Sequence, residues 1–404
     1  MTTTINNEPK KLNVPNLRFP EFSEEWEKER LEDMADFSKG AGISKEQLSG
    51  KGEPCILYGE LYTKYKSEII YDIISKTDID TTKLVRSQAN DVIIPSSGET
   101  AEDIATARCV LNNNILLGGD LNIIRLHKHN GSFISYQLNG RRKYDIAKVA
   151  QGVSVVHLYS EHLKGVNTYN PCIEEQEKIA KLLSLLDKRI ATQNKIIEKL
   201  QSLIKGINQY AFTSAGVKYK LGELCEIRCG YSGNQLTSKN GLKVSRIETI
   251  SGHKVNMERV GYVTPFESSE NYRLQIGDIL FSNINSIEYI GNTAFINKDY
   301  SLYHGMNLLR LIPNKEVVMP FYMYLLLNTR KLLNHYKTIC NKAVSQASIN
   351  QTELGKTVVW IPELKNQRKI CELFQTLYTK IESETSVISC LRKQKQYLLH
   401  QMFI

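Results

Sequence analysis

The strongest constraint in this sequence is a long helical pattern that the chain contains twice. The segment EEQEKIAKLLSLLDKRI begins at Glu174, and KNQRKICELFQTLYTKI begins at Lys365, 191 residues later. Steps of alternately four and three residues from Ile179 or Ile370 give ten positions in each copy, of which nine and eight are apolar. An apolar spacing of 3.5 residues kept over several heptads is typical of a coiled coil. The pattern predicts two long helices, each with one apolar stripe that needs a partner.

Each predicted helix has about 34 residues and, at ~1.5 Å per residue, a length of ~50 Å. Neither contains an internal proline, and Pro171 and Pro362 stand just upstream, where a helix can start. The nearest candidate partner for each helix is the other copy. The apolar positions predicted at this interface are Ile179, Leu183, Leu186, Ile190, Ile197, Leu200 and Ile204 in the first helix, and Ile370, Phe374, Leu377, Ile381, Ile388, Leu391 and Leu398 in the second.

Polar residues interrupt the stripe at the same position of both copies, as Gln193 and Glu384, and the second copy has a further interruption at Lys395. A polar residue in a coiled-coil seam can fix register or orientation, because misaligned pairs leave it without a partner. The alternative is that Gln193 and Glu384 are ordinary interruptions near a solvated edge.

The repeat continues upstream of the two helices. Three further pairs of segments match, beginning at Gln151 and Lys342, at Gly119 and His304, and at Arg30 and Lys220. The chain is therefore two copies of one plan, a globular body of about 130–150 residues followed by a long helix. The expected boundaries are 1–20 for an N-terminal extension, 21–165 for the first body, 172–213 for the first helix, 216–356 for the second body and 362–404 for the second helix.

Each body is predicted to be mixed α/β. Short apolar runs bounded by Gly, Pro, Asn and Ser indicate strands. These runs are NDVIIPSS at 90–97, LNIIRL at 121–126, GDILFSN at 277–283 and MNLLRL at 306–311. One helical stretch follows the later strand of each body, at about 136–149 and 321–336.

Composition narrows the class of protein. With 404 residues, 41% hydrophobic and 24% charged, the chain is expected to be a soluble protein of two or three domains. The longest apolar run, 322–327, falls far short of the ~20 residues that span a bilayer, and the residues after Met1 do not resemble a signal peptide, so we expect a cytoplasmic protein. Eight cysteines without a CxxC pair suit a reducing compartment and argue against a zinc site. The net charge of +9 favours a polyanionic partner.

Enzymatic motifs are not evident. The tetrad Tyr169-Asn170-Pro171-Cys172 is only superficially like the NPPY motif of amino-methyltransferases, because the second proline and the aromatic residue after it are missing. The acidic residues at 99, 102 and 103 lack a lysine at the spacing of a metal-dependent nuclease, and the sequence has no Walker loop. No metal and no catalytic residue is predicted; His127 and His129 are expected to be surface loop residues.

Taken together, the tandem layout, the opening VPNLRFPEFSEEWEKERLEDM from Val14, the block PSSGETAEDIATARC…GGDLNIIRL and the paired EEQ and NQR helices resemble the specificity (S) subunit of Type I restriction-modification systems. The resemblance covers the chain from about Val14 onward. It implies two pseudo-two-fold related target recognition domains separated by two long antiparallel coiled-coil helices.

In function, the resemblance implies a non-catalytic subunit whose two domains each read one half of a bipartite DNA site. The helices would dock two modification subunits and, through them, restriction subunits. This chain would bind no cofactor, with S-adenosylmethionine, ATP and Mg on the partner subunits. Because the two bodies differ in sequence while the helices match, the target should be asymmetric. An alternative function is a coiled-coil scaffold whose bodies bind protein partners.

DNA contacts are expected from polar side chains on loops that rigid strands support. Glu99 can accept from a cytosine amino group, Arg246 can pair with guanine, and Asn or Gln can pair with adenine. For any single residue the alternative is an ordinary surface polar group. The candidates are Lys39, Ser44, Lys45, Tyr58, Ser96, Ser97, Gly98, Glu99, Thr100, Gln151 and Ser154 in the first body, and Tyr231, Ser232, Asn234, Gln235, Arg246, Ser282, Asn283, Asn285, Asn341, Lys342, Ser345 and Gln346 in the second.

Overall fold

The computed structural model describes residues 13–152, 155–212, 216–342 and 346–404. It separates into two compact units: unit 1 comprises Met1–Lys195 and Thr385–Ile404, and unit 2 comprises Ile196–Glu384. Each unit holds one globular body together with segments of both long helices. The bodies are named body 1 (residues 27–170) and body 2 (residues 217–361).

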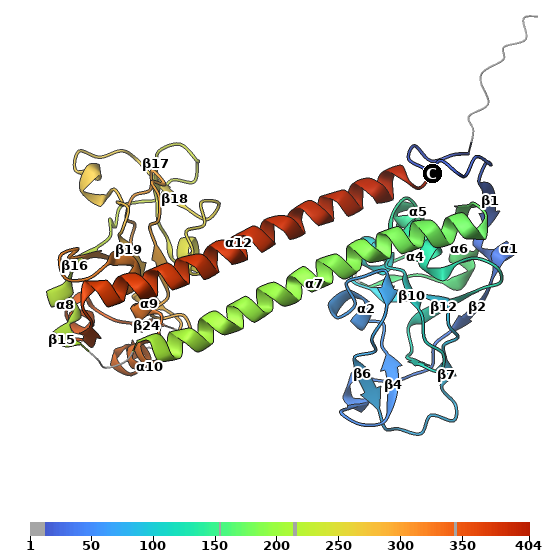
Figure 1. Ribbon diagram of the computed structural model, residues 1–404, viewed down its shortest axis with the longest axis horizontal. Helices are drawn as coiled ribbons and strands as arrows, with labels where there is room; N and C mark the ends of the chain where they lie inside the picture. The colour runs from blue at the N-terminus through green and yellow to red at the C-terminus, as the bar shows by residue number, and fades with distance from the viewer. Residues whose placement is uncertain (1–12, 153–154, 213–215, 343–345) are drawn as a thin grey trace, which may run out of the picture. The chain divides into compact units, whose positions relative to one another are not determined.

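Body 1 is built on two five-stranded sheets (Figure 1). In the first, of order β2-β12-β8-β10-β5, strand β12 pairs antiparallel with both β2 and β8. Strand β12 is the predicted LNIIRL segment, and its first four residues are buried. The first sheet comprises β2 (Ala35–Lys39), β12 (Leu121–Leu126), β8 (Asp91–Pro95), β10 (Arg108–Val110) and β5 (Ile69–Ile70); the second comprises β3 (Leu48–Ser49), β6 (Ser75–Thr77), β4 (Glu53–Ile56), β11 (Leu116–Leu117) and β7 (Val85–Arg86).

Two small strand pairs and several helices complete body 1. The pairs are β1 (Glu27–Arg30) with β14 (Asn167–Asn170), and β9 (Ser97–Gly98) with β13 (Val156–His157). The helices are α1 (Leu31–Met34), η1 (Lys45–Gln47), α2 (Glu60–Thr63), α3 (Ala101–Ile104), α4 (Gly131–Asn139), α5 (Lys143–Val149) and α6 (Ser160–Lys164).

Body 2 repeats this plan with a smaller set of strands. Its main sheet has the order β16-β22-β19-β21, which corresponds to β2-β12-β8-β10 of body 1. The strands of body 2 are β15 (Val217–Lys220), β16 (Cys225–Cys229), β17 (Leu242–Val244), β18 (Gly261–Val263), β19 (Ile279–Phe281), β20 (Ile284–Asn285), β21 (Thr293–Phe295), β22 (Leu309–Pro313), β23 (Asn341–Lys342), β24 (Ala347–Ser348) and β25 (Val358–Ile361). Its helices are α8 (Leu221–Leu224), η2 (Ile247–Ile250), η3 (Ser269–Tyr272), α9 (Pro320–Leu327), α10 (Arg330–Ile339) and α11 (Gln351–Gly355).

The same ion pair joins two strands of the main sheet in both bodies. In body 1, Arg125 of β12 donates to both carboxylate oxygens of Asp91 in β8, at 2.9 and 2.8 Å. In body 2, Arg310 of β22 lies 2.7 Å from the carboxylate of Asp278, which directly precedes β19, and both side chains are almost fully buried. A buried carboxylate needs such a partner, so the Asp and Arg that recur in the repeat reflect a shared structural requirement.

The single helical stretch expected in each body is two helices instead. In body 1, α4 ends at Asn139 because Gly140, with a ψ of −107°, leaves the helical region, and α5 begins at Lys143. In body 2, α9 ends at Asn328, and the Thr329 side chain caps α10 by accepting from Leu332 N. The cap at Thr329 supplies a partner for a free N–H of the first turn, so a new helix can start there.

The long helices are α7 (Ile173–Ala211) and α12 (Leu364–Gln401), which lie within the expected ranges of 172–213 and 362–404. Each starts two residues after its proline, and a buried glutamine anchors its first turn. Gln176 accepts from Asn130 N at 3.0 Å and donates to Pro171 O at 2.8 Å. Gln367 accepts from Met319 N and donates to Pro362 O, both at 2.8 Å. Each glutamine thereby ties the start of its long helix to the start of α4 or α9.

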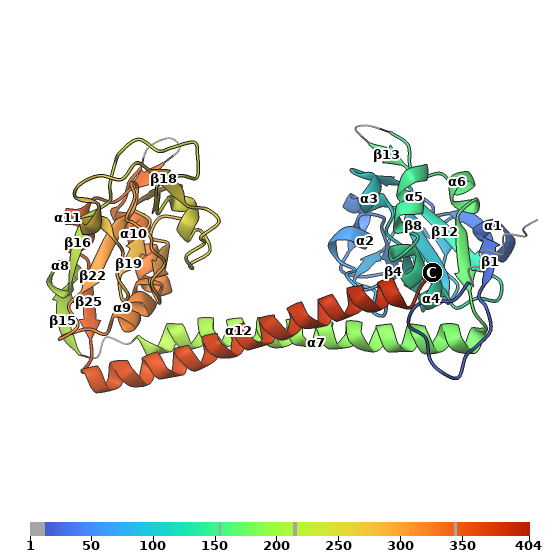
Figure 2. The ribbon, with the colours of Figure 1, turned by 90° about the horizontal axis from the view of Figure 1, so that it is seen from above.

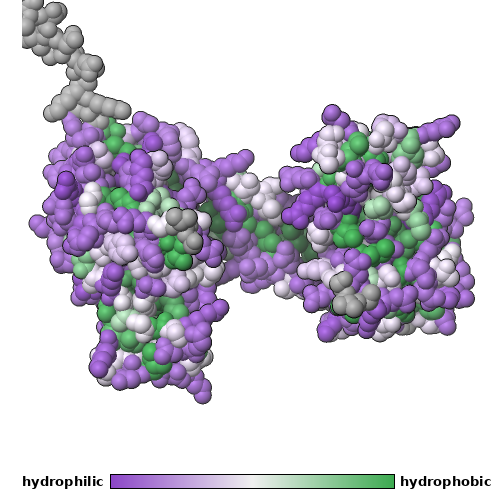
Figure 3. Space-filling model, turned by 180° about the vertical axis from the view of Figure 1, so that it is seen from behind, coloured by the Kyte–Doolittle hydropathy of each residue, from purple (hydrophilic) through white to green (hydrophobic). Residues whose placement is uncertain are grey.

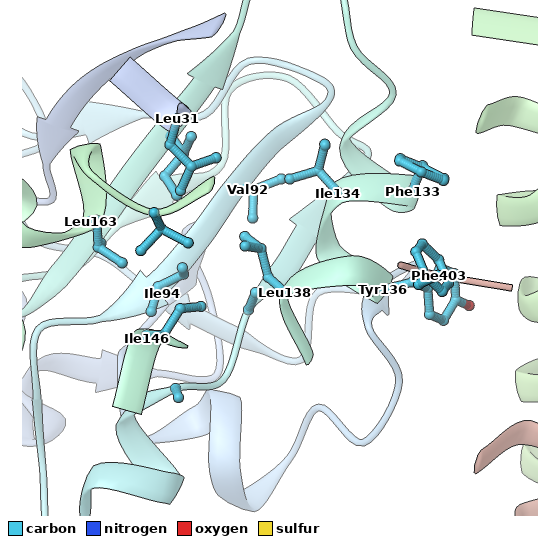
Figure 4. Close-up of a cluster of buried hydrophobic side chains, with 14 of the residues drawn as sticks. Leu31, Val92, Ile94, Phe133, Ile134, Tyr136, Leu138, Ile146, Leu163 and Phe403 are labelled. Carbon is cyan, nitrogen blue, oxygen red and sulfur yellow. The ribbon is translucent and has the colours of Figure 1, made fainter. Parts of the chain in front are cut away.

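Within each unit the two long helices pack in opposite directions. In unit 1, Ile179 and Leu183 near the start of α7 share one buried core with Met402 and Phe403, which follow α12. In unit 2, Ile204 near the end of α7 packs with Phe374 near the start of α12. The beginning of one helix meets the end of the other in both cases, which confirms the expected antiparallel pairing. Figure 4 shows Phe403 beside Tyr136 and Phe133 in the core of unit 1.

The predicted interface positions are all at least partly covered. Ile179, Leu183, Ile204, Phe374, Ile388 and Leu391 are buried, while Leu186, Ile190, Ile197, Leu200, Ile370, Leu377, Ile381 and Leu398 are half-buried. Of the polar interruptions, Glu384 is buried and pairs with Lys380 one turn earlier on its own helix. The buried Oε1 of Gln193 has no hydrogen-bond partner within the described part of the chain. None of the described helices is long and apolar enough to cross a membrane.

Removing a glutamine anchor should destabilise its own unit. Gln176→Ala leaves the Asn130 N–H and the Pro171 carbonyl without their partner, so we expect a loss of roughly 1–3 kcal/mol in the free energy of unfolding. Glu177→Ala, at an exposed position on the same turn, should change stability by no more than about 0.5 kcal/mol. Urea denaturation of both variants measures the difference, and equal stability of the two would contradict the anchoring role.

Candidate nucleic-acid interface

In body 1, candidate residues gather at one end of the main sheet. Strands β2 and β8 are both antiparallel to β12, and Asn122 of β12 lies opposite Lys39 on one side and Ile94 on the other. Lys39 and the segment from Ser96 onward therefore leave the sheet at the same end. Figure 2 shows β13 and α3, which flank this segment, on the side of body 1 away from α7.

Backbone hydrogen bonds bring three further loops to this end. Gly40 N donates to Leu121 O at 2.9 Å, Ala41 N to Leu117 O at 3.0 Å, and Gly118 N to Ile56 O at 2.9 Å. A Cβ on Gly40 would stand only 1.9 Å from Gly118 O, so this close approach requires glycine. The loops that carry the exposed side chains Ser44, Lys45 and Tyr58 are held in this way.

The segments around Ser97 and Gln151 lie side by side. Ser97 and Gly98 of β9 pair with β13, and Gln151 exchanges two backbone hydrogen bonds with His157, at 2.9 and 2.7 Å. Gln151 and Glu99 are exposed, and Ser97 and Gly98 are half-buried. Sequence positions more than fifty residues apart thus lie on one polar surface. Ser154 lies outside the described residues.

Two predicted contacts in body 1 need correction. Ser96 is only 8% exposed, and its hydroxyl is directed at the Asp120 carboxylate, 3.5 Å away. Thr100 is exposed, but its hydroxyl accepts from Asp103 N at 3.1 Å and so caps α3. Both hydroxyls are used within the body, because a turn and a helix start need them. We therefore assign both hydroxyls to support of the loop and not to contact with a base.

Two further residues of body 1, His157 and Tyr159, lie on this surface but are not among the candidates predicted from the sequence. The rings of His157 and Tyr159 stack with centroids 6.2 Å apart, and Lys39 Nζ lies 5.9 Å from the centre of the Tyr159 ring. His157 Nδ1 is also 3.5 Å from Ser97 Oγ. Both rings are exposed. The signal was available in HLYSEH, where two aromatic side chains stand two residues apart and so share one face of an extended segment.

In body 2 the first candidate loop follows β16. Tyr231 N donates to His304 O at 2.9 Å, and a Cβ on Gly230 would stand 1.9 Å from Gly305 O. The ring of Tyr231 stacks on Phe266, with centroids 4.0 Å apart and planes 9° apart. One face of this ring is therefore occupied within the body. The neighbouring Ser232 and Asn234 are exposed.

Gln235 and Arg246 meet beside the β17–β18 pair. Gln235 bridges to Val263, and Gln235 Oε1 and Arg246 Cδ lie 2.7 and 3.1 Å from the place where a Cβ on Gly261 would stand. Arg246 is exposed. Its Nε lies 3.6 Å from Glu248 Oε2, which is a long distance for an ion pair. An amide and a guanidinium side by side at a surface can both donate to base edges. In Figure 2, β18 lies on the side of body 2 away from α12.

A third group of body 2 candidates forms a small sheet. Strand β24 pairs with β20, which holds Asn285, and with β23, which holds Asn341 and Lys342. Ile349 N donates to Asn283 O at 2.8 Å, which ties the Asn283 segment to the same sheet. Asn341, Lys342 and Gln346 are exposed, and Asn283 and Asn285 are half-buried; Ser345 lies outside the described residues.

The prediction for Ser282 is wrong in its detail. Ser282 is fully buried, and its hydroxyl accepts from Asn285 Nδ2 at 3.1 Å. It lies directly after β19, where the strand is still covered, so its side chain orients Asn285 instead of reaching a ligand. The other exposed candidates stay predictions, and Figure 3 shows the mainly hydrophilic surfaces of the two bodies on which such groups stand.

The described residues offer little for catalysis. Among the described positions no cluster of three or more His, Cys, Asp or Glu side chains could hold a metal ion. Burial raises the pKa of Cys109 and of Cys225 to about 12, so neither thiol is a ready nucleophile. Asn170 of the Tyr-Asn-Pro-Cys tetrad is buried, and its amide donates to Glu29 at 2.6 Å. This asparagine therefore belongs to the packing between β14 and β1.

His304 makes the loop of Tyr231 sensitive to acid. It is 1% exposed, and its Nε2 lies 2.9 Å from Leu308 O, which can only accept, so Nε2 carries a hydrogen. Burial, which is opposed by this hydrogen bond, lowers the pKa of His304 to about 4. Since the unfolded histidine titrates near 6.5, body 2 is fully stable above that pH and should lose roughly 3 kcal/mol as the pH falls from 6.5 to 4.

Urea denaturation at several pH values tests this expectation. His304→Gln keeps a donor at this position without a titrating group, so its stability should change much less over the same pH range. An equally steep loss of stability in the wild type and in His304→Gln would contradict the assignment.

Two segments of the chain match one known protein family. Residues 23–202 and 216–391 each match the model of the Type I restriction modification DNA specificity domain. A putative type I restriction enzyme MjaX specificity subunit of Methanocaldococcus jannaschii is 40% identical over 180 residues, which is 44% of this chain and 42% of that protein. The MjaVIII specificity subunit of the same organism is 24% identical over 95% of this chain and 92% of its own length.

The fold is also similar to a solved structure. The crystal structure of a Type I restriction-modification system S subunit from M. genitalium matches with a TM-score of 0.62 and 17% identity, over 97% of this chain and 99% of that one. The two family matches together cover most of the sequence. The chain therefore belongs to the Type I restriction-modification specificity family: it carries two DNA specificity domains, and the part it plays is DNA recognition and not catalysis.

Proposed function

We propose that each body reads one half of a bipartite, asymmetric DNA site. The observation that carries this proposal is that equivalent strand pairs of the two bodies present different side chains. The β9–β13 pair of body 1 brings together Ser97, Gly98, Gln151 and His157, while the β20–β24–β23 sheet of body 2 brings together Asn285, Asn341 and Lys342. Different donors and acceptors on one framework read different bases.

The side chains on each surface suit the two kinds of contact in DNA recognition, to phosphate groups and to base edges. Lysines such as Lys39, Lys45 and Lys342 suit phosphate, which positions the protein on the duplex. The amides of Gln151 and Asn341 and the carboxylate of Glu99 suit base edges, which carry the sequence information. All six side chains are exposed.

We infer that the chain acts with two modification subunits and, through them, with restriction subunits. Support comes from the long helices, which expose large apolar side chains away from their own seam. These are Ile173, Leu185, Leu203 and Tyr210 on α7, and Leu364, Leu373 and Tyr397 on α12. These exposed side chains are the apolar groups that a partner on the helices would cover. The relatives named above are likewise described as subunits.

The cofactors are expected to be divided among the subunits in the same way as the activities. We propose that this chain binds none itself, and that S-adenosylmethionine, ATP and Mg are held by the partner subunits. The proposal rests on the family to which the chain belongs, whose model describes a DNA specificity domain. The cytoplasmic location stays a prediction of the sequence.

Exchanging body 1 tests the bipartite proposal. Replacing residues of about 30–150 by the equivalent body of another family member should change one half of the target and leave the other half intact. Methylated sites can be mapped by sequencing the DNA of cells that also contain the modification subunits. A change in both halves, or in neither, would overturn the assignment of one half-site to each body.

A single lysine provides a finer test. Lys342→Ala should weaken binding to all duplexes about equally and reduce the slope of log K against log salt by about one, because one phosphate contact is lost. Lys365→Ala, which removes an equally exposed lysine at the start of α12, is the matched control and should leave the slope unchanged. Titration of labelled duplexes with modification subunits present measures both, and identical slopes for the two variants would remove Lys342 from the interface.

A further inference from the structure

A buried ionic cluster joins α12 to α7 and body 1 in unit 1. Lys395 of α12 donates to Asp187 of α7 at 2.6 Å and also to Glu68 of body 1. Tyr136 of α4 donates to the same Asp187 carboxylate at 2.6 Å. Side chains of Lys395, Asp187 and Glu68 are at most 13% exposed. The lysine that interrupts the apolar stripe of the second helix is thus matched by two carboxylates.

The equivalent place in unit 2 is apolar. The repeat relates Asp187 to Tyr378 and Lys395 to Ile204, because the helices superpose at a shift of 191 residues. The glutamine anchors relate Asn130 to Met319, so Tyr136 of α4 corresponds to Leu325 of α9. Ile204, Leu325 and Phe374 are buried together there, with Tyr378 packed against them. One body therefore receives a lysine on a carboxylate pair, and the other receives an isoleucine in an aromatic and aliphatic cluster.

These two environments do not accept each other's occupant. An isoleucine at the first place would leave Asp187 and Glu68 buried without the lysine that pairs with them. The other nearby cation, Arg108, donates its hydrogen bonds to backbone carbonyls instead. A lysine at the second place would put an ammonium group among Leu325, Phe374 and Tyr378. Each substitution leaves a charge uncompensated, which is far more costly than the loss of a favourable contact.

We propose that this pattern makes α7 pair with α12 and prevents two copies of the chain from joining through like helices. If α7 met α7 of a second copy, repeat symmetry would place Ile204 against Asp187 and Glu68. If α12 met α12, Lys395 would enter the apolar cluster. The two copies of the repeat are alike enough to pair with themselves, and the ionic cluster excludes that pairing while it supports the pairing within one chain.

The decisive experiment exchanges the two occupants in the full chain. The double variant Ile204→Lys with Lys395→Ile keeps the composition but makes both pairings of α7 with α12 unfavourable and both like pairings favourable. Two full-length copies with different affinity tags are expressed together, and the second tag is measured after purification on the first. We expect the exchange to raise recovery of the second tag roughly tenfold or more over wild type, given the cost of a buried unpaired charge.

The geometry of association needs its own readout. One copy is labelled with a heavy isotope, and cross-linked peptides are identified by mass spectrometry. The proposal predicts cross-links between α7 of one copy and α7 of the other. Cross-links only between α7 and α12, as in the wild type, would overturn it.

The matched control is Ile204→Gln with Lys395→Gln, which disturbs the same two places but supplies no charge to match the carboxylates. It should associate clearly less than the exchanged variant, because like pairings then gain no match between a lysine and the carboxylates; association equal to that of the exchanged variant would overturn the proposal.

A second variant decides the matter if the exchanged chain does not fold. Lys395→Met with Glu68→Gln and Asp187→Asn removes all three charges and keeps groups that can hydrogen-bond to Tyr136. A well-packed neutral replacement of a buried ionic cluster is usually tolerated. We expect this variant to remain folded by circular dichroism and to show several-fold more recovery of the second tag than wild type. Recovery at the wild-type level would show that the charges do not select the partner.

Discussion

The burial of one apolar stripe on each long helix is the interaction on which both units depend. Helices α7 and α12 are long, but most of the stability of a helix in water comes from packing an apolar face and not from helix propensity. In unit 1 the tail of α12 supplies Met402 and Phe403 to the core that contains Trp26 and Phe133. In unit 2 the end of α7 supplies Ile204 to a cluster around Phe374. The core of unit 1 is therefore completed by residues from the end of α12 onward, and the cluster of unit 2 joins the helix that precedes body 2 to the helix that follows it.

The helices and the main strands were predictable because a simple period encodes them. A stripe with a spacing of 3.5 residues, the absence of proline and the prolines just upstream located both helices to within a few residues. Strand β12 was found in full, since LNIIRL is a short apolar run bounded by turn residues. The antiparallel pairing followed from the family resemblance and not from the stripe, because an apolar stripe alone does not fix direction. The break between α4 and α5 was not foreseen, since it depends on one glycine and on tertiary packing.

The candidate site was predictable as a set of segments but not as a set of side chains. The sequence indicated which loops carry polar residues, yet it could not show that Ser282 points inward or that Thr100 caps a short helix. Such roles depend on which way a side chain leaves its turn, and neighbouring polar residues of one loop differ in this respect. The partnership of Lys39, His157 and Tyr159 joins three segments, so no local pattern could reveal it. In the same way, the sequence showed Lys395 only as a polar interruption of an apolar stripe. Its pairing with two carboxylates is visible only in the structure.

The loops at the candidate interface are suspended by main-chain groups. Gly40 against Gly118, Gly230 against Gly305, and the backbone hydrogen bonds at Ala41 and Tyr231 hold them, and a few side chains such as Thr100 add support. The backbone conformation of these loops therefore depends little on the identity of most outward-facing side chains. New binding preferences can therefore arise by exchange of a few surface side chains, one body at a time, while the scaffold beneath them persists unchanged. The ability to change binding preference therefore depends on how the backbone holds the loops.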